Sequence, residues 1–342
     1  MLNIGCATSA FTRDVGIEFI LGKIYGSMKK TDFDLNLAKV YQRAGLIWRI
    51  TKHIRWFGPV MRFLPNPIID WLCDESLKSM ITFCENTKAR IRETVASDTG
   101  LIPDETPSQT ITHAILHSNL PPEEKTMKRI QHEIRAMVAA ASETTAQTMR
   151  LVIYYVYSDI KILSKLRAEI RAATAPHIQD GTLDLANLEK LPFLTAILME
   201  GLRLSPGVVT RLARISPDSD LFYKQWRIPA GTPTGMTALL MHLDEELFPE
   251  PTRFNPSRWS SDEVQKSTHK NWAPFSRGTR MCLGMHLAWA ELYMLIASLV
   301  MRFNFDLADT DLRDVVPVSD NFAVGVRDFC GVKAYVTKYE ET

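Results

Sequence analysis

Apolar residues recur at helical spacing through most of the first two-thirds of the chain. A repeat of three to four residues is typical of helices that bury one face. The clearest helix start is Pro121-Pro122-Glu123-Glu124, because proline and acidic residues are favoured in the first turn of a helix. The long helix that follows carries an apolar stripe from residue 130 to residue 156. The same spacing predicts further helices over these ranges: 11–28, 33–50, 67–92, 160–173 and 191–204.

The pattern changes near residue 205. Short alternations of β-branched and turn residues predict small strands and hairpins over 211–240 and terminal strands over 315–336. Between them, residues 245–274 are rich in proline, tryptophan and phenylalanine without periodicity, which predicts an ordered irregular coil. A last helix is expected at about 282–303. The sequence therefore predicts a mainly α fold with a small β portion.

Charge and composition narrow the class of protein. The chain has 342 residues, with 40 Lys and Arg against 39 Asp and Glu, and 46% of the residues are hydrophobic. This composition excludes a disordered chain, a collagen and a disulfide scaffold, and the near-neutral charge predicts no nucleic-acid partner. The five cysteines form no CxxC motif, and their odd number predicts free thiols in an intracellular compartment. The sequence predicts neither a signal peptide nor a membrane span.

The sharpest motif is the ten-residue segment FSRGTRMCLG, which runs from Phe275 to Gly284. We interpret it as a loop that delivers Cys282 to the start of a helix, where backbone N–H groups and the helix dipole favour a thiolate. Such a thiolate is a good axial ligand for haem iron. Gly284 would let the backbone approach a flat macrocycle, and Arg280 would pair with a propionate. The alternative is a buried structural cysteine with Arg280 as a surface cation.

A second motif is Glu200-Gly201-Leu202-Arg203, in which Glu200 and Arg203 share one face of a helix and can form an ion pair. Most such pairs are solvated and contribute little. The flanking residues here are apolar, however, so a buried pair would need a further partner. Arg258, in the irregular segment that follows, is the candidate partner.

A third motif, AASETT, occupies residues 140–145 in the middle of the long predicted helix. Its small residues permit the close approach of a bulky group, and the acid–alcohol pair Glu143-Thr144 is suited to relaying protons. The alternative is an ordinary helix interface, with a hydroxyl bonded back to the preceding turn.

Taken together, these three motifs resemble the cytochrome P-450 family of haem-thiolate monooxygenases, in the family's order and spacing. The progression from helices to irregular coil is similar to the filamentous-fungal branch used in secondary metabolism, such as the trichothecene-pathway oxygenases. The resemblance implies the cytochrome P-450 fold and a single domain over 1–342. Its helical part would be at about 1–205, and the strands, proximal coil, cysteine loop and last helix at about 206–342.

The resemblance also assigns roles to residues, with haem b as the cofactor. Cys282 would be the axial ligand of the haem iron, and Arg280 and Arg214 would hold propionates. Glu143 and Thr144 would organise water and deliver protons to dioxygen. The full set of implied cofactor contacts is Cys282, Arg280, Arg214, Phe275 and Gly284. The implied structural ion network is Glu200, Arg203 and Arg258. The substrate pocket would be lined by Ala136, Ala140, residues 207–210 and the turn at Asn321-Phe322.

The activity implied by the resemblance is hydroxylation or epoxidation of a small apolar metabolite, such as a terpenoid or polyketide, with O2. Electrons would come from an NADPH-cytochrome P-450 reductase that docks on the cysteine side, where Lys266, Lys270 and Arg277 supply positive charge. Members of the family are usually found on the endoplasmic reticulum membrane. The apolar segment at Trp56-Phe57 fits either a peripheral membrane patch or a lid over the substrate channel.

Two departures from the family lead to alternatives. Chains of this family are longer by roughly a quarter to a third, all of it at the front, so the resemblance implies that the N-terminal anchor and first strands are missing. The strands expected at 233–240 would then present an open edge, and a non-catalytic haem-binding remnant is the alternative function. A third hypothesis retains the haem for isomerisation or peroxide-driven chemistry. The smaller departure is Ala141, where the family more often has glycine and where a methyl group would narrow the groove on the oxygen side.

Overall fold

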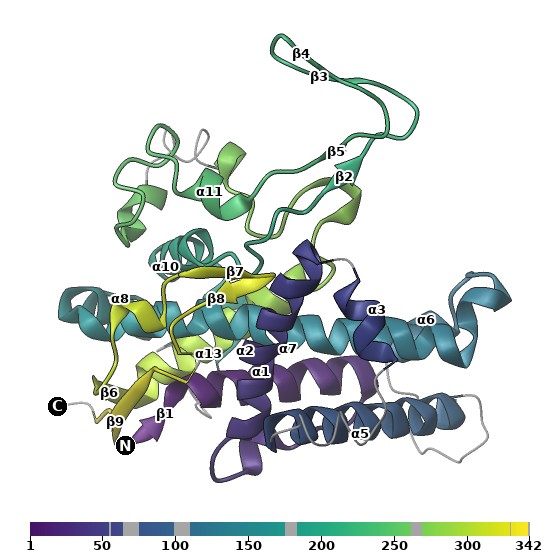
Figure 1. Ribbon diagram of the computed structural model, residues 1–342. Coiled ribbons are helices and arrows are strands. Elements are labelled where there is room, and N and C mark those ends of the chain that lie inside the picture. Colours follow the sequence, from purple (N-terminus) through teal and green to yellow (C-terminus); the bar gives the residue numbers. More distant parts are fainter. Residues whose placement is uncertain are drawn as a thin grey trace.

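The computed structural model describes residues 1–54, 56–63, 75–98, 110–174, 183–260, 269–328 and 330–340. Most of this part of the chain is helical (Figure 1). The helices are α1 (Ile4–Leu21), α2 (Leu35–His53), α3 (Phe57–Arg62), α5 (Glu75–Asp98), α6 (Ile111–Leu116), α7 (Met127–Ser158), α8 (Ile160–Thr174), α9 (Leu185–Leu188), α10 (Pro192–Leu204), α11 (Ala238–His242) and α13 (Met285–Arg302).

The strands are short and form one three-stranded sheet and three two-stranded ones, all antiparallel. The larger sheet has the order β1-β9-β6, so the first and last strands of the chain lie side by side, with Leu2 opposite Ala334 (Figure 1). The strands are β1 (Leu2–Asn3), β2 (Arg214–Ile215), β3 (Leu221–Tyr223), β4 (Trp226–Ile228), β5 (Pro233–Thr234), β6 (Phe303–Leu307), β7 (Ser319–Asn321), β8 (Ala323–Gly325) and β9 (Lys333–Lys338).

Helix α7 is the centre of the molecule, with α1 lying along it and α8, α10 and α13 packed around its second half (Figure 1). Its buried residues Met149, Val152 and Val156 belong to the largest apolar core cluster of the described residues. Gly201 of α10 lets the two helices approach closely, because an added Cβ there would clash with a methyl carbon of Val152. The long helix is therefore held on several sides, which fixes the direction in which each of its side chains points.

The structure confirms the predicted fold class, and most helix ranges agree within a few residues. Helix α7 begins at Met127, five residues after the Pro122 that was expected to open it, because a 3-10 turn over Pro122–Lys125 comes first. Helix α1 begins at Ile4 instead of residue 11 and ends where Gly22 adopts a left-handed conformation with φ 72°. The first part of the helix expected at 67–92 lies outside the described residues, and α5 covers its second part.

Three other expectations about elements need correction. The last helix begins at Met285 and not at Cys282, since Gly284 forms its N-terminal cap position. The end of that prediction, and the residues beyond it, form strand β6 because they pair with β9. Residues 238–240, expected to be part of a strand, belong instead to the short helix α11, and among the described residues β5 pairs with β2 alone.

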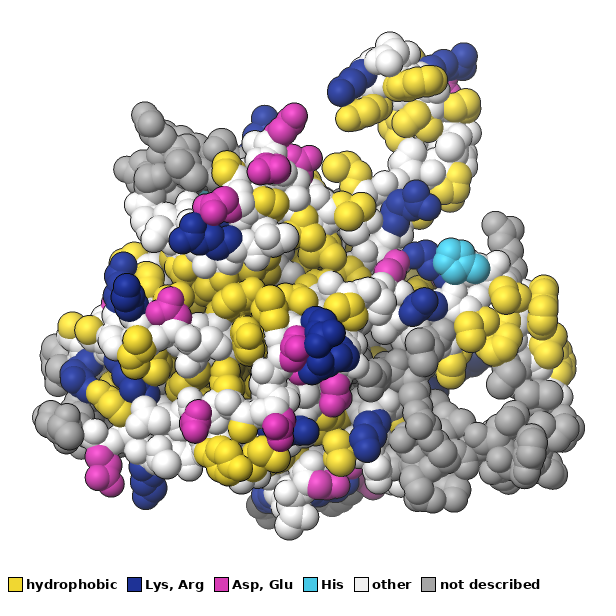
Figure 2. Space-filling view, turned by 60° about the vertical axis from the view of Figure 1, so that its left-hand side comes forward, with side chains coloured by type: hydrophobic (Ala, Val, Ile, Leu, Met, Phe, Trp, Pro, Cys, Tyr) yellow, Lys and Arg dark blue, Asp and Glu magenta, His cyan; other side chains and the backbone are white. Residues whose placement is uncertain are grey.

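The β3–β4 hairpin forms an arm that projects from the body of the molecule (Figure 1). Hydrophobic and cationic side chains gather on it (Figure 2), and Phe222 and Trp226 are 75% and 65% exposed. Among the described residues, no helix combines the length and the apolar character needed to cross a bilayer.

Candidate functional site

A large cleft of about 1640 Å³ lies between the middle of α7, the start of α13 and the loop that carries Cys282. Ligand pockets commonly measure about 300–1,000 Å³, so this cleft has room for a large group together with a second molecule. All five residues expected to contact a cofactor line it: Arg214, Phe275, Arg280, Cys282 and Gly284. The structure therefore brings together the residues of the cysteine motif and a cation from strand β2.

The loop between Phe275 and Gly284 presents Cys282 to this cleft. The Cys282 N–H donates to the Phe275 carbonyl oxygen at 2.9 Å, which closes the loop on itself. The turn depends on left-handed backbone at Ser276 (φ 62°) and Gly278 (φ 77°). Cys282 is exposed, so the alternative of a buried structural cysteine is wrong.

The chemistry of the lining fits a haem group. The cleft is mainly apolar, with one thiol and the guanidinium groups of Arg280 and Arg214 among its polar groups. A thiolate ligates iron, guanidinium groups bind carboxylates, and apolar walls suit a flat macrocycle. A Cβ added at Gly284 would meet nothing within 4 Å, so the backbone next to the thiol faces open space.

Glu200 of α10 is the centre of a buried ion network. Its carboxylate accepts from Arg203 Nε at 2.9 Å and Nη2 at 2.8 Å, and it lies 3.4 Å from Arg258 Nε. The indole N–H of Trp259 and the backbone N–H of Asn255 donate to the same carboxylate, each at 3.0 Å. Glu200 and Arg203 are both 0% exposed. The structure thus brings together the three residues expected to form this network and satisfies the buried charges.

His242, which the sequence analysis missed, links this network to the cysteine loop. Its Nε2 accepts a hydrogen bond from the backbone N–H of Ala273 at 3.0 Å. Its Nδ1 lies 3.0 Å from the Arg203 carbonyl oxygen, to which it donates. Burial lowers the pKa of His242 to about 4, and the neutral ring fits both bonds. Trp272 adds a second link, because its indole N–H donates to the Met199 carbonyl at 3.2 Å. The residues just before the cysteine loop, Trp272 and Ala273, are therefore fastened to α10.

Glu143 and Thr144, the acid and the alcohol of the third motif, lie on different sides of helix α7. Thr144 lines the cleft, and its hydroxyl donates to the Ala140 carbonyl at 3.0 Å. Glu143 is not part of the lining; it is buried on the side of Arg150, with Glu143 Oε2 2.8 Å from Arg150 Nη2. Successive residues of a helix point about 100° apart, which accounts for the separation. The structure therefore does not bring Glu143 to the cleft beside Thr144.

A different acid, Glu291 of α13, does line the cleft. It is 5% exposed, and burial raises its pKa to about 8, although a hydrogen bond with Thr145 opposes the shift. Its Oε1 has no hydrogen-bond partner in the described structure. The sequence signal was a single acid in the otherwise apolar segment that follows the cysteine.

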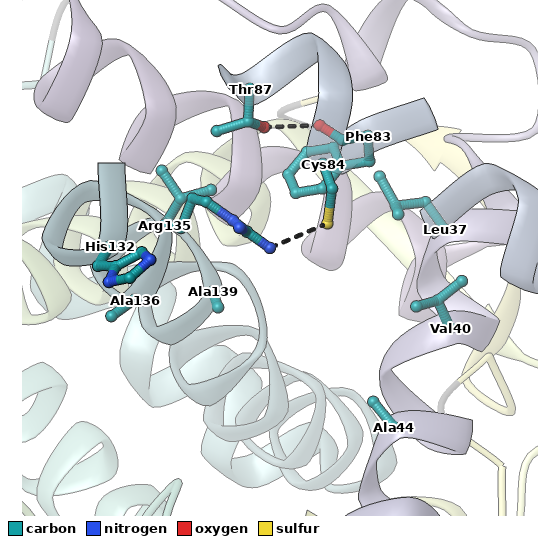
Figure 3. Close-up of a pocket in the computed structure, with 11 residues that line it drawn as sticks. Leu37, Val40, Ala44, Phe83, Cys84, Thr87, His132, Arg135, Ala136 and Ala139 are labelled. Carbon is teal, nitrogen blue, oxygen red and sulfur yellow. Dashed lines mark hydrogen bonds between the residues drawn. The ribbon is translucent and has the colours of Figure 1, made fainter. Parts of the chain in front are cut away.

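Other expected site residues lie elsewhere. Ala136 lines a separate pocket of about 370 Å³ between α2, α5 and α7, where Cys84 Sγ lies 3.8 Å from Arg135 Nη2 (Figure 3). Phe322 contacts the ring of Trp48, with the centroids 4.7 Å apart, and is not among the residues of the large cleft. Ala140 and most of residues 207–210 do line it.

Of the three cations expected to lie at a reductase docking surface, the structure describes two, Lys270 and Arg277. Lys266 lies outside the described residues. Lys270 and Arg277 both border the cleft, and Arg277 Nη2 donates to the carbonyl oxygens of His269 and Trp272 at 2.7 and 3.0 Å. Reductase docking on this side stays a prediction.

The family model for cytochrome P-450 matches residues 2–325. The chain belongs to the cytochrome P-450 family. A solved structure, the haem domain of cytochrome P-450DA, superposes with a TM-score of 0.73 at 15% identity and covers 99% of this chain and 68% of that one. The fold predicted from the resemblance is therefore confirmed, and the family and this neighbour support haem as the cofactor.

The chain is also similar to fungal cytochrome P-450 enzymes of secondary metabolism. N-acetyltryptophan 6-hydroxylase ivoC of Emericella nidulans is 32% identical over 323 residues, which cover 94% of this chain and 62% of that protein. Tryptophan 6-hydroxylase fscE of Fusarium equiseti is 32% identical over 325 residues, with the same coverage. Cytochrome P-450 monooxygenase sdnH of Sordaria araneosa is 30% identical over 341 residues and covers 98% of this chain. The chain spans 62% of the length of each of these three relatives.

Proposed function

We propose that this chain is the haem-binding part of a monooxygenase that inserts one oxygen atom of O2 into a small, mainly apolar metabolite. The observation that supports it most is the exposed Cys282 thiol in a cleft of about 1640 Å³ that is also lined by Arg280, Arg214 and Thr144. A thiol, two cations and a long apolar wall are the groups that a haem with a neighbouring substrate requires.

Haem, when bound, supplies the iron at which dioxygen is activated. Cys282 would hold the iron through its thiolate, and the hydrogen bond from Cys282 N–H to the Phe275 carbonyl closes the loop that presents this sulfur to the cleft. Arg280 and Arg214 would neutralise the propionates. The ion network of Glu200, Arg203 and Arg258 does not contact the haem site itself. It supports the cysteine loop indirectly, because His242 connects Arg203 to Ala273, which precedes the loop.

Proton handling is assigned to residues on the wall of the cleft. The carboxyl of Glu291, with a pKa raised to about 8 by burial, holds a proton at neutral pH next to Thr145. Thr144 places a hydroxyl on the same wall. Glu143 has a different role in this proposal: it pairs with Arg150 on the side of α1 and keeps that part of α7 in position.

The substrate is expected to be an apolar molecule with few charged groups, because the cleft walls are mainly aliphatic and aromatic. Two of the relatives are named as hydroxylases of tryptophan and N-acetyltryptophan. Indole compounds are therefore the first substrates to test, before terpenoids and polyketides. Electrons are expected from an NADPH-dependent cytochrome P-450 reductase.

The test is the spectrum of the haem-loaded chain after reduction and addition of carbon monoxide. Thiolate ligation gives a Soret band shifted to the red of an ordinary haem–CO complex, and Cys282→Ser is expected to abolish that shift. Cys84→Ser is the matched control, because Cys84 is a partly exposed thiol outside the cleft. A shifted band that survives in Cys282→Ser would refute the assignment of the ligand.

Activity is tested separately with NADPH, a reductase and an indole compound. Formation of a hydroxylated product that requires all three supports the monooxygenase. A thiolate spectrum without NADPH-dependent product from indole, terpenoid or polyketide substrates would instead support a chain that binds haem without turnover. Product formed with peroxide alone would favour peroxide-driven chemistry.

A further inference from the structure

Two buried thiols meet outside the cleft. Cys6 lies in the first turn of α1, and Cys330 lies in the turn that leads into β9. Their Sγ atoms are 2.7 Å apart, although 324 residues separate them in the sequence. Cys6 is 0% exposed and Cys330 is 6% exposed. Neither residue lines the large cleft, so the proposed oxygenase function gives them no role.

The backbones on both sides of this contact are tied together. Asn3 Nδ2 donates to the Cys330 carbonyl at 3.0 Å, and Asn3 Oδ1 accepts from the Cys6 N–H at 2.9 Å. Gly5 N–H donates to the Val332 carbonyl at 3.0 Å, next to the pairing of β1 with β9. Because one asparagine side chain bridges the two cysteines, the thiols are held together by the fold and do not meet by chance rotation of side chains.

The charges around the pair give the two sulfurs different roles. The hydrogen bond between the thiols lowers the pKa of Cys330, and the positive charge of buried Arg150 lowers it further, against burial and the charges of Asp328 and Glu143. The same bond, with burial, raises the pKa of Cys6. Of the two sulfurs, Cys330 is therefore the one that loses its proton more readily, and Cys6 is the one that retains it.

We propose that Cys6 and Cys330 form an oxidative modification site, at which hydrogen peroxide converts the two thiols into a disulfide between α1 and the turn before β9. The Cys330 thiolate attacks one peroxide oxygen, the O–O bond breaks, and Cys330 sulfenic acid and hydroxide form. The Cys6 sulfur then attacks the Cys330 sulfur, an S–S bond replaces the S–O bond, and the hydroxyl leaves as water with the Cys6 proton. Two thiols are oxidised by two electrons, and one peroxide is reduced.

Little movement is needed for this reaction. A disulfide bond is about 2.05 Å long, so the sulfurs need to approach by less than 1 Å from their 2.7 Å separation. The cross-link would fasten α1, whose Gly5 carbonyl accepts from Arg150 Nε of α7 at 3.1 Å, to the sheet at the other end of the chain. It would close a very long loop, which is the case in which a cross-link restricts the unfolded chain most.

The experiment treats the 342-residue chain, purified with dithiothreitol and then freed of it, with hydrogen peroxide. Remaining thiols are alkylated in denaturant, and the peptides are mapped by mass spectrometry without reduction. The expected result is a peptide pair that contains Cys6 joined to Cys330 and that separates on reduction. The melting temperature of the oxidised chain is expected to exceed that of the reduced chain by roughly 5 °C.

Two variants make the result specific. Cys6→Ala removes one partner and is expected to abolish both the linked peptide and the rise in melting temperature. Cys84→Ser, which changes another thiol that lies beside an arginine, is expected to leave both unchanged. Recovery of Cys6 and Cys330 as separately alkylated peptides after peroxide would overturn the proposal, and this readout in the unchanged protein holds even if Cys6→Ala folds poorly.

Discussion

The region around Glu200 and the neighbouring region around Cys282 differ in how far their polar side chains are buried. Around Glu200 and Arg203, charged side chains are 0% exposed, and the Glu200 carboxylate is surrounded by donors from four residues. Around Cys282 the chain is open: the thiol is exposed, and Leu283 beside it is 81% exposed. His242 joins the two regions, because it contacts the Arg203 backbone on one side and Ala273 on the other.

The difference shows how a binding site can be open and still be well positioned. A loop that binds an incoming group must leave its ligand atom accessible, so burial of that atom cannot be what holds the loop in place. Its rigidity then has to come from residues behind it. The network around Glu200 supplies this support, and its charges are tolerated in the interior because almost every donor has an acceptor.

The largest effect is expected from Glu200→Ala. The change leaves the buried guanidinium of Arg203 without its carboxylate and also removes the acceptor for Trp259 and Asn255. We expect a loss of at least ~5 kcal/mol in the free energy of unfolding, measured with a chemical denaturant. The matched control is Glu250→Ala, which breaks the exposed Glu250–Arg253 pair and should cost less than ~1 kcal/mol. Equal losses in the two variants would remove the distinction between the regions.

The pH dependence of Glu291 tests the cleft side of the comparison. Its folded pKa of about 8 lies above the ordinary value of 4.5, so the folded state binds more protons between these values and loses stability as the pH rises. From pH 6 to pH 8.5 this should cost about 2.5 kcal/mol. Glu291→Gln is expected to abolish that slope, whereas Glu245→Gln, at an exposed position, should retain it. The same slope in wild type and Glu291→Gln would show that this carboxyl is not protonated at neutral pH.

Because His242 is buried in its neutral form, we expect it to make the folding stability fall as the pH falls. Its folded pKa of about 4 lies below the ordinary 6.5, so the unfolded state binds more protons between these values and stability falls as the pH falls. From pH 7 to pH 5 the loss should be about 2 kcal/mol. His242→Gln should remove this part of the acid sensitivity, and His53→Gln, on an exposed helix end, should not. The measurement is chemical denaturation of the wild type, His242→Gln and His53→Gln at pH 7 and pH 5. An equal loss in the wild type and in His242→Gln would contradict this role of His242.

The last effect concerns Gly207, on the wall of the cleft. Gly207 has φ +68°, and an added Cβ would lie 3.1 Å from Thr144 Cβ. Gly207→Ala should cost about 2 kcal/mol, from the backbone conformation and from crowding of α7. Gly231→Ala isolates the first cause, because Gly231 has φ +79° and nothing within 4 Å of the added atom; about 1 kcal/mol is expected. If Gly207→Ala lowers the free energy of unfolding no more than Gly231→Ala does, then Thr144 and α7 shift to accommodate the added methyl group at little cost.

Periodicity and local motifs were enough to predict the fold class, the central helix and the residues around Cys282. These features depend on short-range rules: a repeat of 3.6 residues, a turn at Gly278 and an ion pair across one helical turn between Glu200 and Arg203. Strand β6 was missed although its residues alternate between apolar and polar, because it follows the last helix directly, with no turn residue between them. Only pairing with β9, about 30 residues later in the chain, decides where that helix ends.

The parts of the site that the sequence did not predict depend on tertiary burial. Nothing local to His242 shows that its ring will be enclosed between Arg203 and Ala273, and Glu291 is distinctive only because the helix around it is apolar. Glu143 is a different case. Adjacent residues cannot share a helix face, so its separation from Thr144 was available from geometry once the helix was assigned.

One close contact between α1 and α7 has a consequence for the shape of the cleft. A Cβ placed on Gly16 would lie 2.8 Å from the Ala141 Cβ, and Ala141 also borders the cleft. The two helices thus share a gap that accommodates a single methyl group, and in this protein α7 carries it. A related chain with glycine at the position of Ala141 can carry alanine at the position of Gly16 instead, so the residue types at these two positions are expected to vary together.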